Sequence, residues 1–226
     1  MADDKTITPE LAVTDRAAAV SMLTTVFGFL AQGDRLTLGS QSIALIPAAT
    51  TPTHGRIDHL ALAVNDVDAT LASLLSRGAR LDDTTPKGPK EIPEFWENGV
   101  RYVFLQGPEG ARIELCAKRQ TATRADLPGH DHIGLPCTDI TATAAFFESL
   151  GLTPLAAVTL TREDGETHVR FLGHGAHVVE LYEPPHLRGT KGTNPETALW
   201  HGLRLTGATG PKGPFQGPDG LRVTLL

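Results

Sequence analysis

The chain has 226 residues, and with 40% hydrophobic and 20% charged residues its composition is that of a globular protein. Its net charge is −6 and it has no cluster of Lys or Arg, so neither a nucleic acid nor an anionic membrane is expected as a partner. The two cysteines, Cys116 and Cys137, form neither a disulfide framework nor a CxxC metal motif.

The N-terminal sequence MADDKTITPE has no signal-peptide pattern, and no apolar run approaches the ~18 residues of a membrane span. We therefore expect a cytoplasmic protein. The many Gly and Pro residues favour short strands and turns over a helical bundle.

The first elements in chain order form a short unit. A strand ELAVTD at 10–15 leads into a helix predicted over 16–29 and a hairpin predicted over 35–48.

Two longer units follow, and they repeat one another. IDHLALAVND at 57–66 and DHIGLPCTD at 131–139 are strand-like, and each precedes an amphipathic helix, predicted over 67–78 and 140–151. Asp66 and Asp139 are the expected N-caps, and Gly78 and Gly151 the expected helix stops. Further strands come after each helix, at 78–81 and 101–116 in one unit and at 152–160 and 167–183 in the other.

The C-terminal residues look like a fourth, truncated unit. HGLRLTG resembles a first strand, and GPFQGPDGLRVTLL resembles VFLQGPEGARIELC, including its Gly-Pro-acid-Gly turn. The sequence thus predicts an α+β fold of four tandem βαβββ units, the outer two degenerate, with cupped mixed sheets and helices outside. The predicted boundaries are 1–52, 53–120, 121–190 and 191–226.

Each complete unit carries a histidine in its first strand and a glutamate in its last strand. His59 and Glu114 are 55 residues apart, and His132 and Glu180 are 48 apart. Because side chains alternate across a strand, all four are expected to face the concave side of the sheet. A lone His in a strand is more often a structural residue, but burying the same two residue types twice without a partner would be costly. Two imidazoles and two carboxylates suit a borderline divalent cation.

These motifs resemble the vicinal oxygen chelate superfamily, which includes glyoxalase I, bleomycin-resistance proteins, extradiol dioxygenases and methylmalonyl-CoA epimerase. DH[LI] at 58–60 and 131–133, with GPEGARIEL and GAHVVEL, carries the resemblance. It implies paired βαβββ modules around one divalent metal ion (Ni, Zn, Co, Mn or Fe) held by His59, Glu114, His132 and Glu180. The ligand order is most similar to that of glyoxalase I.

The outer units lack these ligands. The alignment places Thr8 and Ala44 at the His and Glu positions of the first unit, and Trp200 or His201 and Thr224 at those of the fourth. If unit 1 pairs with 2 and unit 3 with 4, the ligands are split between two cups. If 2 pairs with 3 and 1 with 4, they converge in one cup, which is the arrangement we prefer; a swapped dimer reaches the same result.

The resemblance implies a metal-dependent lyase or isomerase acting on a small vicinal-oxygen substrate through an enediolate-type intermediate. Glu180 is the expected general base, with Glu114 as the symmetric candidate, and Tyr182 and Cys116 face the substrate. The Arg and Asn that hold glutathione in glyoxalase I are replaced by Ala63 and Lys118, which argues against a glutathione-dependent reaction.

Two other functions stay open: a ring-cleaving dioxygenase of the extradiol type, and a non-catalytic protein that binds a small molecule or an antibiotic. The remaining histidines of the repeats are expected at the surface or in loops: His130, His168, His174, His177 and His186.

Overall fold

Three ten-residue helices each begin behind an aspartate whose side chain accepts a hydrogen bond from the first turn. Asp15, Asp66 and Asp139 cap helices α1 (Arg16–Thr25), α2 (Val67–Ser76) and α3 (Ile140–Ser149). Helices α2 and α3 end before Gly78 and Gly151, which both adopt positive φ, as their sequences predicted.

The computed structural model describes residues 5–33, 35–39, 41–119 and 129–226. The boundary predicted between 120 and 121 therefore lies outside the described residues, and the four unit boundaries stay predictions. No helix in the described part of the chain is long and apolar enough to cross a membrane.

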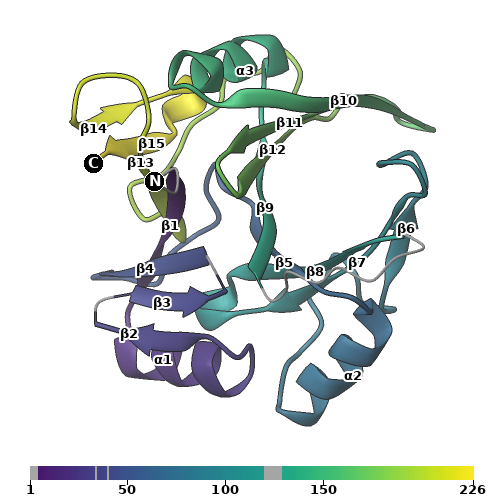
Figure 1. Cartoon of the computed structure of the whole chain (residues 1–226), viewed down its shortest axis with the longest axis vertical. Helices are drawn as coiled ribbons and strands as arrows, with labels where there is room; N and C mark the ends of the chain where they lie inside the picture. Colours follow the sequence, from purple (N-terminus) through teal and green to yellow (C-terminus); the bar gives the residue numbers. More distant parts are fainter. Residues whose placement is uncertain (1–4, 34, 40, 120–128) are drawn as a thin grey trace.

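The strands form two curled sheets that lie side by side (Figure 1). One has eight strands, in the order β10-β11-β12-β9-β5-β8-β7-β6, and the other has seven, in the order β14-β15-β13-β1-β4-β3-β2. The eight strands are Thr153–Arg162, Gly165–His174, His177–Glu183, Gly129–Pro136, His59–Ala63, Arg112–Lys118, Val100–Gln106 and Lys90–Ile92. The seven strands are Gly213–Gln216, Arg222–Leu225, Trp200–Thr206, Thr6–Val13, Gln41–Pro47, Arg35–Leu38 and Leu30–Gln32.

This strand order joins units 2 and 3 in one sheet and units 1 and 4 in the other, as the sequence analysis preferred. Both sheets have the same centre, in which the first strands of two units pair antiparallel: β5 with β9, and β1 with β13. The last strand of each unit pairs parallel to the first, as β8 does with β5 and β12 with β9. The fold is therefore the predicted α+β arrangement of cupped mixed sheets.

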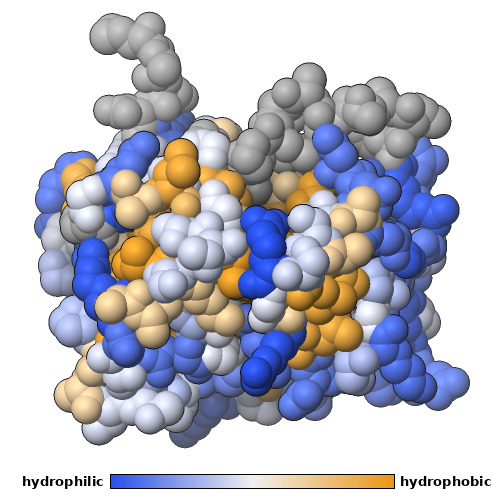
Figure 2. Space-filling view, turned by 90° about the horizontal axis from the view of Figure 1, so that it is seen from below, coloured by the Kyte–Doolittle hydropathy of each residue, from blue (hydrophilic) through white to orange (hydrophobic). Residues whose placement is uncertain are grey.

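The helices lie on the outer faces of the sheets (Figure 1). Helix α3 packs on β11 and β12, and α2 packs on β7 and β8, where their apolar stripes are buried. Four large hydrophobic side chains of the described residues are exposed: Leu30, Leu75, Leu155 and Leu226. On the face seen in Figure 2, apolar areas are interrupted by polar residues.

Three details differ from the prediction. The strand expected at 78–81 is reduced to a single bridge between Leu81 and Leu105. His174 and His177 were expected at the surface or in loops, but they are only 1% and 2% exposed. The reason is that the turn joining β11 and β12 packs against the other sheet. There, His174 Nε2 lies 2.7 Å from the carbonyl oxygen of Thr206. Burial and the charge of His174 lower the pKa of His177 to about 4.

The third difference is the histidine-equivalent position of unit 4. In unit 3, Glu180 pairs with Gly134 on the neighbouring parallel strand, and His132 lies two residues before Gly134. Unit 2 has the same spacing between its histidine and the residue that pairs with its glutamate. Arg204 pairs with Thr224, so Gly202 stands at this position, and Trp200 and His201 do not.

The repeated Gly-Pro-acid-Gly turns connect the two sheets. Glu109, in the turn η1 (Pro108–Gly110) of unit 2, accepts hydrogen bonds from the backbone N–H and hydroxyl of Thr14, just before α1. Asp219, in the turn η2 (Pro218–Gly220) of unit 4, accepts the Thr138 hydroxyl at 2.7 Å, just before α3. Each acidic side chain thus binds the residues just before the N-terminal end of a helix, in the neighbouring unit and on the opposite sheet.

Asp219 also forms an ion pair with Arg56 at 2.8 Å, and both side chains are only 11% exposed. We expect Asp219→Ala to lower the free energy of unfolding by about 3 kcal/mol, because Arg56 would keep its charge without its partner in a mostly buried position. Glu109→Ala removes the corresponding contact with Thr14, which is more exposed, and should lower the free energy of unfolding by less than about 1 kcal/mol. Chemical denaturation of both variants measures the difference, and equal losses would contradict this account.

Candidate functional site

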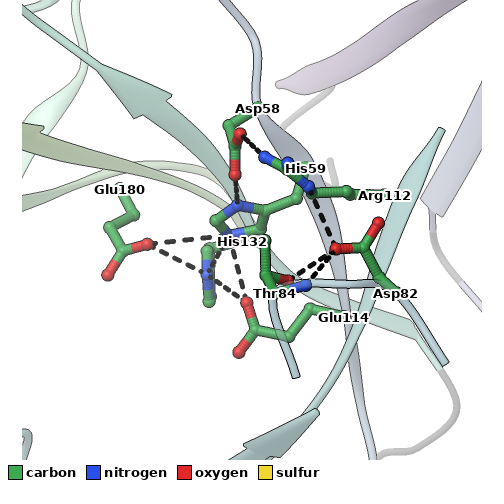
Figure 3. A network of polar contacts seen from close by, with 8 residues as sticks. All are labelled: Asp58, His59, Asp82, Thr84, Arg112, Glu114, His132 and Glu180. Atoms are coloured by element: carbon green, nitrogen blue, oxygen red, sulfur yellow. Dashed lines mark hydrogen bonds and ion pairs between the residues drawn. The ribbon is translucent and has the colours of Figure 1, made fainter. Parts of the chain in front are cut away.

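Four side chains from four neighbouring strands meet on the concave face of the eight-stranded sheet. His59 comes from β5, Glu114 from β8, His132 from β9 and Glu180 from β12. All four are buried, with relative exposures between 3% and 7%. The structure thus brings together every residue that the sequence analysis named as a metal ligand (Figure 3).

The candidate ligand atoms lie close to one another. The Nε2 atoms of His59 and His132 are 3.1 Å apart. Glu114 Oε2 lies 3.1 Å from His59 Nε2 and 3.5 Å from His132 Nε2. Glu180 Oε2 lies 3.7 Å and 3.2 Å from the same two nitrogens.

Three of these five distances, between 3.1 and 3.2 Å, match the ligand-to-ligand spacing around a transition-metal ion, and the other two are 0.1–0.3 Å longer than that spacing. Ligand atoms that each lie ~2.1 Å from one ion are ~3.0–3.4 Å from one another in octahedral or tetrahedral geometry. Two N–H groups cannot both point into the 3.1 Å gap between the imidazole nitrogens, whereas a cation accepts both lone pairs. Imidazole nitrogens and carboxylate oxygens are also donors that such ions prefer.

An aspartate directly before each histidine orients its ring. Asp58 Oδ2 lies 2.9 Å from His59 Nδ1, and Asp131 Oδ2 lies 3.1 Å from His132 Nδ1. An Nδ1–H donated to a carboxylate leaves Nε2 as the atom directed toward the centre. Asp58 is in turn bound by Arg112, whose Nε lies 3.4 Å from Asp82 (Figure 3).

The charges of this cluster compensate one another. Burial alone would lower the pKa of His59, but hydrogen bonds to Asp58 and Glu114 outweigh it and raise that pKa to about 9. Burial would also lower the pKa of His132, but the charge of Glu180 and the hydrogen bond to Asp131 outweigh it and raise that pKa well above its usual value. Burial would raise the pKa of Glu114, yet its bonds to both histidines lower it to about 2.

The four ligand residues form the floor of a cleft of about 250 Å³ with largely apolar walls. Tyr182 and Cys116 both line it, as the sequence analysis expected of substrate-facing residues. Burial and the charge of Asp58 raise the pKa of Tyr182 well above 10, so its hydroxyl stays protonated and able to donate. Burial likewise raises the pKa of Cys116, which keeps it a neutral thiol.

Sequence reasoning did not assign roles to the two orienting aspartates or to the aromatic walls, although a signal for both is present. The dipeptide Asp-His occurs at both first strands. Phe104 and Phe171 occupy equivalent places, because each pairs across its hairpin with the glutamate of its own unit. Their Phe-Leu dipeptides are a second repeated pattern.

The centre of the seven-stranded sheet is different. At the positions of His59, Glu114, His132 and Glu180 it carries Thr8, Ala44, Gly202 and Thr224. Glu10 and Arg204 occupy the places of Ala61 and Gly134 and form an ion pair at 2.6 Å. This second centre therefore neutralises its own charges, and the donor set exists only in the eight-stranded sheet of the described chain.

No protein-family model matches the sequence, and no curated protein matches it. Solved structures do resemble it. Glyoxalase I from Zea mays has 18% sequence identity and a TM-score of 0.71, with 98% of this chain and 92% of that chain covered. A putative dioxygenase from Bacillus subtilis subsp. subtilis str. 168 has 11% identity and a TM-score of 0.63, with 96% and 83% covered. The chain therefore has the fold of the vicinal oxygen chelate superfamily, which its repeated motifs predicted.

The site depends on a glycine opposite His59. A Cβ atom at Gly134 would lie 2.0 Å from Cε1 of the His59 ring. We expect Gly134→Ala to lower the free energy of unfolding by about 1–3 kcal/mol through overpacking. The double variant Gly134→Ala/His59→Ala removes the clash and should lose less than the sum of the two single changes.

Urea denaturation of the four proteins of this cycle measures the coupling. Gly173→Ala, on the nearby strand β11, is the control, because its new methyl would meet only the flexible end of Leu155 at 3.1 Å. Simple additivity of the two site changes would show that His59 does not occupy the space above Gly134.

Proposed function

We propose that this protein is a metal-dependent isomerase or lyase of the glyoxalase type, acting on a small vicinal-oxygen substrate without glutathione. The observation that carries the proposal is a pair of imidazole Nε2 atoms 3.1 Å apart, with each of two carboxylates 3.1–3.7 Å from both nitrogens, in an apolar cleft. All four groups belong to one chain, so the site is complete in a monomer, and a homodimer stays compatible with it.

His59, Glu114, His132 and Glu180 would hold one divalent ion, and Ni, Zn, Co, Mn and Fe all suit this donor set. Such an ion supplies Lewis-acid polarisation of two adjacent substrate oxygens. The aspartates behind both histidines hold the rings in place, so that the donor atoms need little reorganisation.

A carboxylate of the cluster would remove the proton from the substrate carbon beside the polarised carbonyl and return it to the neighbouring carbon. The isomerisation consumes no oxidant, because the same proton and electron pair are redistributed within the substrate. We assign this role to Glu180, whose side chain is 10% exposed against 6% for Glu114, and keep Glu114 as the symmetric candidate. Tyr182 would donate a hydrogen bond to the developing negative charge.

The absence of a glutathione grip supports a different substrate. Ala63 is buried in β5, and the ammonium of Lys118 lies 4.0 Å over the ring of Trp96 rather than in the cleft. Among the described residues that line the cleft, none is a Lys or an Arg. The two carboxylates of glutathione would therefore meet no cation there.

A ring-cleaving dioxygenase remains the rival function. Such enzymes use two histidines and one carboxylate with open positions on iron or manganese, whereas this cluster offers two carboxylates. Uptake of dioxygen by the iron-loaded protein with catechol would favour the dioxygenase. A protein that binds no metal at all, yet retains an apolar cleft, would favour the non-catalytic binding function.

The first test is metal content. We expect the purified protein to bind about one divalent ion per chain, and His132→Ala to weaken that binding at least ~100-fold, since it removes one of the four candidate donors. His168→Ala is the matched control, because His168 lies outside the cleft beside the Thr159 hydroxyl. Metal analysis after dialysis measures both, and stoichiometric metal in the His132 variant would contradict the assignment.

The second test concerns the base. Glu180→Gln removes the proton acceptor but keeps an oxygen donor, so it should slow carbon–hydrogen exchange of α-hydroxy ketones in D₂O by ~10²–10⁴-fold. NMR measures the exchange on hydroxyacetone and 2-hydroxyacetophenone. If Glu114→Gln, and not Glu180→Gln, abolishes the exchange, the two carboxylates have the opposite roles; exchange unaffected by either change rules both out as the base.

A further inference from the structure

We infer that the substrate of this site is an uncharged compound in which an apolar ring adjoins the two neighbouring oxygens. This inference rests on the proposed function and narrows it to a substrate class. Three independent features of the cleft support it: the rings in its walls, the charges of its lining residues and the size set by the loop along one wall.

Aromatic side chains are concentrated in the cleft. The chain has twelve aromatic residues, eight Phe, two Trp and two Tyr, and six of them line this one cleft. They are Phe95, Trp96, Tyr102, Phe104, Phe171 and Tyr182. A site that only had to hold two oxygens over an ion would not need half of the rings of the protein, whereas an aromatic ligand gains edge-to-face and stacking contacts from them.

The rings are arranged around the candidate metal ligands. The centroid of Phe104 lies 5.0 Å from that of His59, and Phe171 lies 6.3 Å from His132. Phe171 also meets Phe95 at 5.4 Å and Trp96 at 5.0 Å. A substrate whose oxygens reach the histidines would therefore place its next atoms between aromatic faces.

The charges of the cleft disfavour an anion. Its lining residues contribute four carboxylates, Asp58, Glu114, Asp131 and Glu180, and a divalent ion balances only two of them. Arg112 is already paired with Asp58. A substrate carboxylate or phosphate would lie close to these carboxylates and would meet no cation among the described lining residues.

The loop between β6 and β7 forms one wall of the cleft. Its Glu94 forms a bidentate ion pair with Arg162 at the end of β10, with contacts of 2.6 and 3.1 Å, so the loop reaches the opposite edge of the sheet (Figure 1). Phe95 and Trp96 point from this loop into the cleft. The volume of the cleft, about 250 Å³, is below the ~300–1,000 Å³ typical of drug-sized ligands and suits a compound with a single ring.

Hydroxamates test this inference, because all of them present two adjacent oxygens to a metal ion. The compounds compared differ only in the substituent attached to the hydroxamate group. Isothermal titration of the Ni²⁺- and Zn²⁺-loaded protein compares acetohydroxamate, benzohydroxamate, 4-carboxybenzohydroxamate and a glutathione-linked hydroxamate. We expect benzohydroxamate to bind at least about tenfold more tightly than acetohydroxamate, since its ring is buried. The added carboxylate should remove most of that gain.

Phe171→Leu and Phe95→Leu should each reduce the preference for benzohydroxamate over acetohydroxamate at least about threefold, while acetohydroxamate affinity is unchanged. Phe215→Leu is the control, because Phe215 lies in β14 of the other sheet, away from the cleft, and is partly buried against the core. Thermal unfolding of the three variants, with metal content, shows that fold and metal are retained.

The outcomes separate the two proposals. Failure to retain metal, or to bind any hydroxamate, overturns the proposed function itself. Retained metal with equal affinity for acetohydroxamate and benzohydroxamate overturns only the ring-bearing substrate. Tightest binding of the glutathione-linked or carboxylated compound overturns the uncharged class and restores an anionic substrate.

Discussion

The close approach of strands β5 and β9 at the centre of the eight-stranded sheet is the constraint on which the site depends. Their antiparallel register places His59 opposite Gly134 and His132 opposite Ala61. Small residues at both facing positions leave room for the imidazole rings, whose Nε2 atoms come within 3.1 Å. Glu114 and Glu180 then enter from the parallel neighbours on either side, so the symmetry of the sheet creates the symmetry of the donor set.

The seven-stranded sheet shows what this architecture does without that chemistry. It repeats the same central pairing, but Glu10 and Arg204 fill the space where the other sheet has Ala61 and Gly134. An acid and a base held together need no external ion, whereas two imidazoles beside two carboxylates leave lone pairs directed at a common point. The chain thus contains one centre whose charges pair internally and a second centre that we propose holds a metal ion.

The two halves are also mechanically connected. The acids of the two Gly-Pro-acid-Gly turns bind the entrances of α1 and α3 across the junction, and Asp219 joins this contact to Arg56, three residues before His59. The strand that carries the first histidine is therefore anchored by a residue from the far end of the sequence. Rigid support of this kind favours a preorganised set of donors over one that assembles on binding.

The sequence by itself determined the repeated units, the helices with their aspartate caps and the four candidate donors, because periodicity, capping and repeated His and Glu positions are local signals. It did not determine the residue of unit 4 that is equivalent to the histidines, or the burial of His174 and His177, since strand register and contacts between sheets involve residues far apart in the chain. Only the tertiary structure decided that units 2 and 3 share one sheet. It alone also placed the rings of Phe95 and Trp96 in the wall of the cleft, because the loop that carries them has no counterpart in the repeated pattern and meets the donors only through the fold.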